Sequence, residues 1–237
     1  MTTFQGLLRK NIINANTQFE RLGYISNNIA NMNTTAYKGV SFEQYLNADG
    51  YLTGVVRNDR RAGKLLVTEN KFDFGIEGQG FVPVTSENGE VQYTRDGVMK
   101  QNKDGYLITT DGYLIGDGIK LPANYEDFSI KSNGDVMVTM VKGEKPYKAG
   151  TIPVVIFQNP DELKALDGNK FVQTPESGEP MLLVNHDRVA HQKLENTNVN
   201  TFKEVQKVMR LNASMLASMK MINVINDMYE KSINLQG

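Results

Sequence analysis

The sequence contains neither cysteine nor tryptophan among its 237 residues, and its only histidines are His186 and His191. Without cysteine there is no disulfide, no thiolate metal ligand and no cysteine nucleophile. The two histidines are five residues apart, which is not the i, i+4 spacing of a helical zinc pair, so we expect no metal site. We also expect no cofactor, because Gly75, Gly78 and Gly80 occur in the wrong order for a dinucleotide fingerprint and there is no phosphate-binding loop.

An excess of charge of either sign is missing as well. The 26 basic and 27 acidic residues leave a net charge of −1, which excludes a strongly basic nucleic-acid surface as the main feature. No segment approaches the roughly 18 apolar residues that a membrane span requires, so we expect no membrane insertion. The first 16 residues also lack the apolar core and cleavage site of a signal peptide. We therefore expect either no export or export by a route that needs no Sec signal.

Two amphipathic segments stand at the ends of the chain, over residues 4–33 and 201–235. Their apolar positions recur at alternating steps of three and four, as on one face of a helix. Each stripe alone is typical of an ordinary core helix. At the two ends of one chain, however, they predict a coiled-coil pair that needs further copies to cover its remaining apolar surface. The predicted assembly seam consists of Leu8, Ile12, Ala15, Phe19, Leu22, Ile29, Val205, Val208, Met215, Met219 and Ile222.

The middle of the chain is rich in turn signals. Six Asp-Gly and two Asn-Gly dipeptides punctuate it, and these dipeptides close tight hairpins because they tolerate positive φ. The runs between them predict short strands. They are residues 81–85, 91–94, 106–109, 113–115, 129–130, 136–141, 152–157 and 171–173. The expected fold is therefore α+β, with terminal helices that pair as a coiled coil and flank a mostly antiparallel β domain.

These patterns predict four segments along the chain. Residues 1–39 are the N-terminal helix of an inner coiled-coil domain, and residues 40–70 are a linker or arm. Residues 71–194 are a β-rich outer domain, and residues 195–237 are the C-terminal helix. The arginines of the arm are either solvated or partners in intersubunit salt bridges, and the sequence leaves both open.

The stretch NNIANMNTTAYK at residues 27–38 closely resembles the N-terminal signature of the flagellar rod and hook family. That family has Gly-Phe where this chain has Ala36 and Tyr37. An asparagine-rich helix end is suited to a sharp turn, because asparagine tolerates the left-handed conformation. The predicted motif turn consists of Asn27, Asn28, Ala30, Asn31, Asn33, Thr34, Tyr37 and Lys38.

The resemblance continues in the family's order over nearly the whole chain. The further matching stretches are residues 72–81, 93–97, 104–113, 157–180 and 194–200. Together they are most similar to the proximal and distal rod proteins of the bacterial flagellar basal body. Two departures exist: residues 213–218 replace the family's Arg-x-Tyr-Glu-x-Asn run, and the segment 40–63 is short for a distal rod protein.

The resemblance implies a mechanical role and no catalytic residues. It implies a structural subunit that assembles with itself and with neighbouring rod or hook subunits into a hollow helical shaft that transmits torque. The subunit would pass through the flagellar export apparatus, reside in the periplasmic rod of the basal body, and lie within any rings around the rod. Two alternatives remain open. One is a hook-like subunit, and the other is a soluble carbohydrate-active enzyme with helical oligomerisation arms and a cleft of carboxylates with perturbed pKa.

Overall fold

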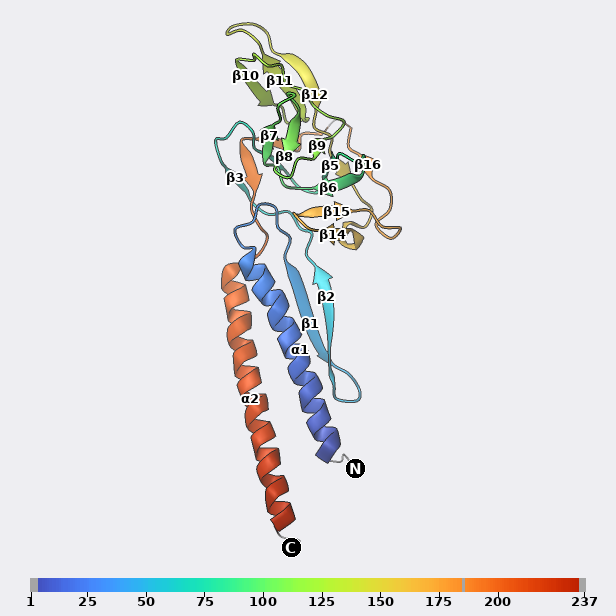
Figure 1. Ribbon diagram of the computed structural model, residues 1–237, viewed down its shortest axis with the longest axis vertical. Coiled ribbons are helices and arrows are strands. Elements are labelled where there is room, and N and C mark those ends of the chain that lie inside the picture. The colour runs from blue at the N-terminus through green and yellow to red at the C-terminus, as the bar shows by residue number, and fades with distance from the viewer. Residues whose placement is uncertain (1–3, 185, 235–237) are drawn as a thin grey trace. The chain divides into compact units, whose positions relative to one another are not determined.

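The computed structural model describes residues 4–184 and 186–234, apart from a few side chains near the helix ends. The chain forms two compact units, and each contains segments that are far apart in the sequence. Unit 1 consists of residues 1–32, 39–59 and 199–237, and unit 2 consists of residues 33–38 and 60–198. The chain therefore crosses between the units four times. Figure 1 colours the ends of the chain in unit 1 blue and red, and the middle of the chain green to yellow in unit 2.

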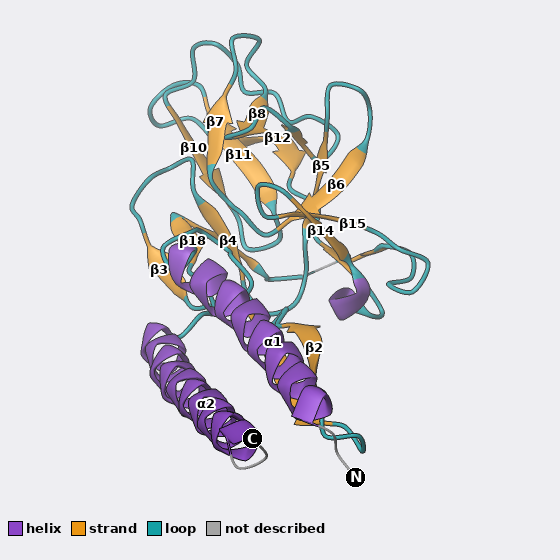
Figure 2. Cartoon of the chain, turned by 60° about the horizontal axis from the view of Figure 1, so that its bottom comes forward, coloured by secondary structure: helices purple, strands orange, loops and turns teal. Residues whose placement is uncertain are grey.

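Unit 1 contains two long helices and one hairpin (Figure 2). The helices are α1 (Phe4–Ala30) and α2 (Thr201–Asn234), close to the two predicted ranges; residue 235 lies outside the described residues. The hairpin strands are β1 (Val40–Leu46) and β2 (Leu52–Asn58), which pair antiparallel. Most of the predicted linker or arm is thus a regular hairpin.

The hairpin packs on α1 through one aromatic contact. The ring of Phe42 on β1 is buried and stacks on Tyr24 of α1, with ring centroids 5.3 Å apart. Gly54 on β2 leaves the space for Phe42, because a Cβ there would lie 1.8 Å from the ring. Asn14 and Thr17 of α1 both contact Leu52, through its backbone N–H and its carbonyl respectively. A two-stranded ribbon is marginal alone in water, so this contact with α1 is what makes the hairpin stable.

Unit 2 is built from short strands, and every strand pair is antiparallel. The largest sheet has seven strands in the order β14-β15-β6-β5-β9-β8-β7. Its strands are β5 (Val82–Thr85), β6 (Val91–Thr94), β7 (Met99–Gln101), β8 (Leu107–Thr109), β9 (Leu114–Ile115), β14 (Lys164–Leu166) and β15 (Lys170–Val172).

Smaller sheets complete unit 2. A three-stranded sheet has the order β10-β11-β12, and the pairs are β13-β16, β17-β4 and β18-β3. Their strands are β3 (Leu65–Val67), β4 (Phe74–Ile76), β10 (Asp127–Ile130), β11 (Asp135–Thr139), β12 (Tyr147–Thr151), β13 (Val155–Ile156), β16 (Met181–Leu182), β17 (Val189–His191) and β18 (Lys193–Glu195). One 3₁₀ turn, Pro160–Glu162, precedes β14. The last two pairs join the beginning of unit 2 to its end.

The interior of unit 2 holds two apolar clusters. The larger contains aliphatic side chains from the sheets, with Val84, Leu107 and Val136 completely buried at its centre. The smaller is aromatic: Phe81 meets Phe157 and Phe171 edge-to-face, at centroid distances of 5.8 and 5.6 Å. The fold is therefore α+β, with the β structure carrying its own core. Within the described residues, no helix is both long enough and apolar enough to cross a membrane.

Candidate assembly site

The predicted motif turn begins on the last turn of α1, in unit 1. Asn31 donates from its side chain to the backbone carbonyl of Asn27 at 2.9 Å and to the Asn27 side chain at 3.0 Å. The backbone N–H of Asn31 donates to the same Asn27 carbonyl at 3.1 Å, so the Asn31 side chain reinforces the last hydrogen bond of the helix. Ala30 is the last helical residue, and residues 31–36 turn.

Asn28 performs a different task from the other asparagines. Its side chain is buried and binds both backbone groups of Val40, the first residue of β1: the amide donates to the carbonyl at 2.7 Å, and the amide oxygen accepts the N–H at 2.9 Å. The same amide donates to Glu204 of α2 at 3.4 Å. One side chain thus fixes α1, β1 and α2 within unit 1. An aspartate or a leucine would leave buried backbone groups unpaired there.

The end of the motif lies in unit 2. Ala36 adopts a left-handed backbone with φ of 56°, and its N–H donates to the carbonyl of Glu195 at 2.8 Å. Lys38 is buried and binds the Glu195 carboxylate and the Arg61 carbonyl. The remaining motif positions, Asn33, Thr34 and Tyr37, also belong to unit 2. Consecutive residues of the motif therefore anchor two different units.

Three of the matched motifs each contribute one residue to a buried charge cluster in unit 2. The Glu195 carboxylate is completely inaccessible and accepts from Lys38, from Arg95 at 2.7 Å and from the N–H of Gly63 at 2.6 Å. The other guanidinium N–H groups of Arg95 donate to backbone carbonyls, including that of Gly78 at 2.9 Å. Each of the three charged residues comes from a stretch that carries the family resemblance, and no pattern in the sequence indicates that they meet.

Ala36 offers a direct test of the strained turn. A left-handed backbone costs an L-residue roughly 1–2 kcal/mol, and glycine avoids that cost but loses more chain entropy on folding. We expect Ala36→Gly to raise the free energy of unfolding by about 0.5–1 kcal/mol, measured by urea unfolding of the purified chain. This would explain why the family has glycine at this position.

Ala190 provides the matched control, because it lies on strand β17 of the same unit and no left-handed backbone is found there. Glycine weakens a regular strand, so Ala190→Gly is expected to lower the free energy of unfolding by about 0.5–1 kcal/mol. A loss of stability in both variants would contradict strain at Ala36.

The two helices contact each other through polar as well as apolar residues. Gln18 of α1 donates to Ser214 of α2 at 3.2 Å, in addition to the contact between Asn28 and Glu204. On each helix, some of the less exposed positions follow a heptad, whereas others on α1, such as Thr17 and Tyr24, face the β1–β2 hairpin. The heptad positions are Asn11, Ala15, Gln18, Leu22, Ile25 and Ile29 on α1, and Glu204, Val208, Leu211, Met215, Ser218, Ile222 and Ile225 on α2.

The predicted seam divides between this face and solvent. Six of its positions, Ala15, Leu22, Ile29, Val208, Met215 and Ile222, lie on the less exposed heptad. Ile12, Phe19, Val205 and Met219 are exposed instead. The side chain of Leu8 lies outside the described residues. The predicted stripe therefore runs along the border between the helix–helix contact and the open face of each helix.

The alternative of an enzyme predicts carboxylates with a perturbed pKa, and one such group, Asp96, lies in unit 2. Burial raises the pKa of Asp96, and the nearby charges of Asp111 and Asp73 raise it further. The Asp96 carboxylate accepts the N–H of Val98 at 3.2 Å, so it closes a turn of its own chain. In the described part of the chain no three His, Asp or Glu side chains are grouped so that they could hold a metal ion.

The motifs and the two-unit fold define the class, a subunit of the flagellar hook and rod type. The family profile described as "Flagellar hook protein FlgE/F/G D1 domain" matches residues 75–138, within unit 2. The chain is 31% identical to the flagellar basal-body rod protein FlgG of Agrobacterium fabrum, over 89% of this chain and 92% of that protein.

Two further relatives are as extensive. FlgG of Caulobacter vibrioides is 29% identical, over 90% of this chain and 92% of its own length. The flagellar basal-body rod protein FlgF of the same organism is 29% identical, over 91% of both chains. The chain belongs to the flagellar basal-body rod protein family.

Proposed function

We propose that this chain is a structural subunit of the flagellar basal-body rod. Copies of it assemble into a hollow helical shaft that carries torque. Membership of the rod protein family supports this role. The observation that carries the assembly itself is the apolar surface that unit 1 leaves exposed along both helices.

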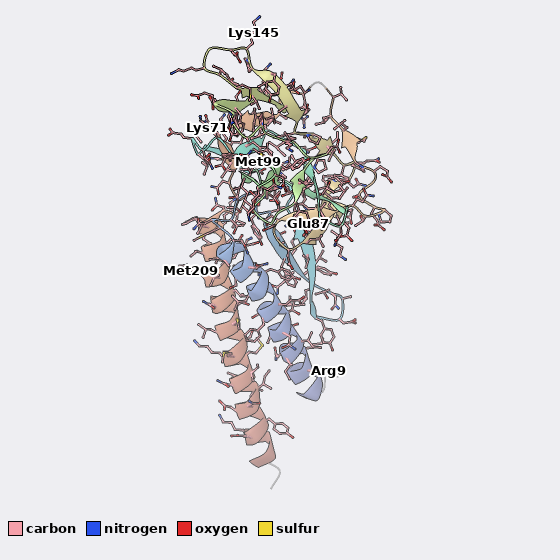
Figure 3. All side chains as sticks on the ribbon, turned by 45° about the horizontal axis from the view of Figure 1, so that its top comes forward. Arg9, Lys71, Glu87, Met99, Lys145 and Met209 are labelled. Atoms are coloured by element: carbon pink, nitrogen blue, oxygen red, sulfur yellow. The ribbon has the colours of Figure 1, made fainter. Side chains whose placement is uncertain are left out.

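That surface has the spacing of a helix-packing stripe. On α2 one stripe comprises Phe202, Val205, Met209, Leu216 and Met219, at steps of three, four and seven residues, and further apolar residues are exposed towards the end of the helix. Met209 is labelled in Figure 3. On α1 it comprises Ile12 and Phe19, which is 56% exposed. Exposed apolar patches of this kind mark interaction surfaces, and a stripe that repeats along a helix fits another helix. The occupant we propose is a helix of a neighbouring copy.

We also propose a finer architecture. The two helices pair as a coiled coil in an inner tube, and the β-rich unit forms an outer layer. Because the stripes on α1 and α2 are different surfaces, their contact between copies is heterologous and propagates as an open helix. The motif turn, with Asn28 at its centre, fixes where the chain leaves the helical unit. The boundaries we propose for the inner domain are residues 1–39 and 195–237.

The proposed partners are other copies of this chain, neighbouring rod subunits, the flagellar export apparatus and rings around the rod. We place the assembled protein in the periplasmic part of the basal body, after export that needs no cleaved Sec signal. We propose no catalytic role, because the curated relatives are rod proteins. Their names also favour the rod over a hook-like subunit or a carbohydrate-active enzyme.

The proposed stripe can be tested by placing a charge on it. Met219 is 60% exposed, so Met219→Asp should leave the circular dichroism of the purified chain unchanged. It should weaken self-association at least tenfold, measured by sedimentation velocity, because the aspartate would be desolvated in the contact between copies.

Ala217 is the matched control, since it is exposed on α2 and lies off the stripe. Ala217→Asp introduces the same charge one half-turn away and should self-associate as the unaltered chain does. Equal association of Met219→Asp and the unaltered chain would overturn the proposed stripe.

A further inference from the structure

Methionine supplies every sulfur atom in this chain, because the sequence has 11 methionines and no cysteine. A peroxide that meets the protein therefore finds no thiol to oxidise, and the thioethers are the remaining sulfur targets. Five of the methionines lie on α2, between Met209 and Met228. The sulfur chemistry of the chain is therefore concentrated on one helix of unit 1.

Exposure divides the methionines into accessible and protected ones. Met209 is 66% exposed and Met219 is 60% exposed, and both lie on the apolar stripe of α2. Met99 is only 3% exposed, among the strands of unit 2 (Figure 3). Because an oxidant has to reach the sulfur atom, oxidation follows exposure. The sulfur atoms that are open in the single chain thus include two on the stripe that we propose to contact a neighbouring copy.

Methionine suits a contact between helices only while its sulfur is reduced. The thioether is flexible and polarisable, so it packs well against neighbours of irregular shape. Oxidation turns this apolar side chain into a polar sulfoxide, which disrupts methionine-rich contacts. The flanking stripe residues, Val205 and Leu216, have no side-chain donor for the sulfoxide oxygen. An unpaired acceptor in an apolar contact is costly, so oxidation should open the contact between copies.

We propose that Met209 and Met219 are oxidation sites of the free subunit, and that their sulfoxides prevent the subunit from joining its neighbours. In the reaction, hydrogen peroxide transfers one oxygen atom to each sulfur: its O–O bond breaks, an S–O bond forms and water leaves. The sulfur loses two electrons, and the peroxide gains them. The inference rests on the rod-subunit function proposed above, because the stripe meets a neighbour only in an assembly.

Peptide mass spectrometry of the full chain after treatment with hydrogen peroxide identifies the sites. At a dilution where the chain is monomeric, Met209 and Met219 should gain oxygen at least about tenfold faster than Met99. Sedimentation velocity of the concentrated protein should then show self-association weakened about tenfold, with unchanged circular dichroism. Methionine sulfoxide reductase with a thiol reductant should restore association, because two electrons and two protons return and the oxygen leaves as water.

A pair of leucine substitutions separates these two sites from oxidation elsewhere in the chain. Met209→Leu with Met219→Leu keeps the apolar surface and removes the sulfur, so association after peroxide should stay within about twofold of its untreated value. The matched control is Met140→Leu with Met181→Leu, because both of these methionines are exposed in unit 2 and lie off α2. The control should lose association after peroxide as the unaltered chain does.

Either of two results would overturn the oxidation sites alone. One is unchanged association of the unaltered chain although both Met209 and Met219 are oxidised. The other is an equal loss of association after peroxide in the Met209→Leu, Met219→Leu variant. If the untreated chain does not associate at any concentration, the rod-subunit function is overturned together with the oxidation sites.

Discussion

Glu195→Gln is expected to lower the free energy of unfolding by about 3–5 kcal/mol. The substitution keeps the size of the side chain but removes the negative charge that Lys38 and Arg95 both bind, and both of these cations are buried. The two buried cations would then lose the carboxylate that they share. Urea unfolding of the purified chain, followed by circular dichroism in the β-sheet band, measures the loss.

Asp127→Asn is the matched control, because Asp127 also belongs to unit 2 and also pairs with a lysine, Lys71, at 2.7 Å. Both of these side chains are more than half exposed, so water replaces the lost interaction and the unfolding curve should barely move. If both variants lost the same free energy of unfolding, the buried Glu195 cluster would stabilise the fold no more than an exposed ion pair does.

Patterns that repeat along the chain were sufficient for much of the fold. The apolar spacing predicted both helices within a few residues, because a helix is stabilised along one continuous face. The Asp-Gly and Asn-Gly turns located hairpins such as β5–β6, since positive φ at Gly89 is a local requirement. Both signals lie within a short stretch of sequence.

Pairings between distant segments could not be predicted in this way. Strands β3 and β4 pair with β18 and β17, more than a hundred residues later, and each has only three residues. Their register depends on the partner rather than on their own pattern. The Glu195 cluster was missed for the same reason, because Lys38, Arg95 and Glu195 are adjacent only in space.

The predicted stripe on each helix differs from the less exposed face in a regular way. The prediction has Ile12 and Phe19 where the structure has Asn11 and Gln18 on the less exposed side. Polar side chains can lie in a helix contact when they find partners, as Gln18 does in Ser214. A rule that assigns apolar residues to the contact cannot foresee this, and at these two positions it selects apolar residues that the single chain leaves exposed.

Gly97→Ala is expected to destabilise unit 2 by about 3 kcal/mol or more, because the chain passes too close for any side chain. A Cβ at Gly97 would lie 1.6 Å from the carbonyl oxygen of Phe74, so the backbone of β4 would have to move. The carbonyl of Gly97 accepts the N–H of Phe74 at 3.1 Å, and Met99 donates to Phe72 at 3.0 Å. Hydrogen exchange at the Phe74 and Met99 amides should accelerate in the variant, in step with the lower urea midpoint.

Gly89→Ala is the control that separates the steric clash at Gly97 from the effect of replacing a glycine. It has a φ of 82° in the β5–β6 turn, and nothing lies within 4 Å of a Cβ there. Gly89→Ala therefore introduces backbone strain alone, worth about 1–2 kcal/mol, and should leave exchange at Phe74 slow relative to Gly97→Ala. Equal acceleration at Phe74 in both variants would mean that the close approach at Gly97 does not hold β4 in place. Faster exchange at Phe74 in Gly97→Ala alone would show that the close approach at Gly97, within the matched stretch 93–97, holds β4 against the rest of unit 2.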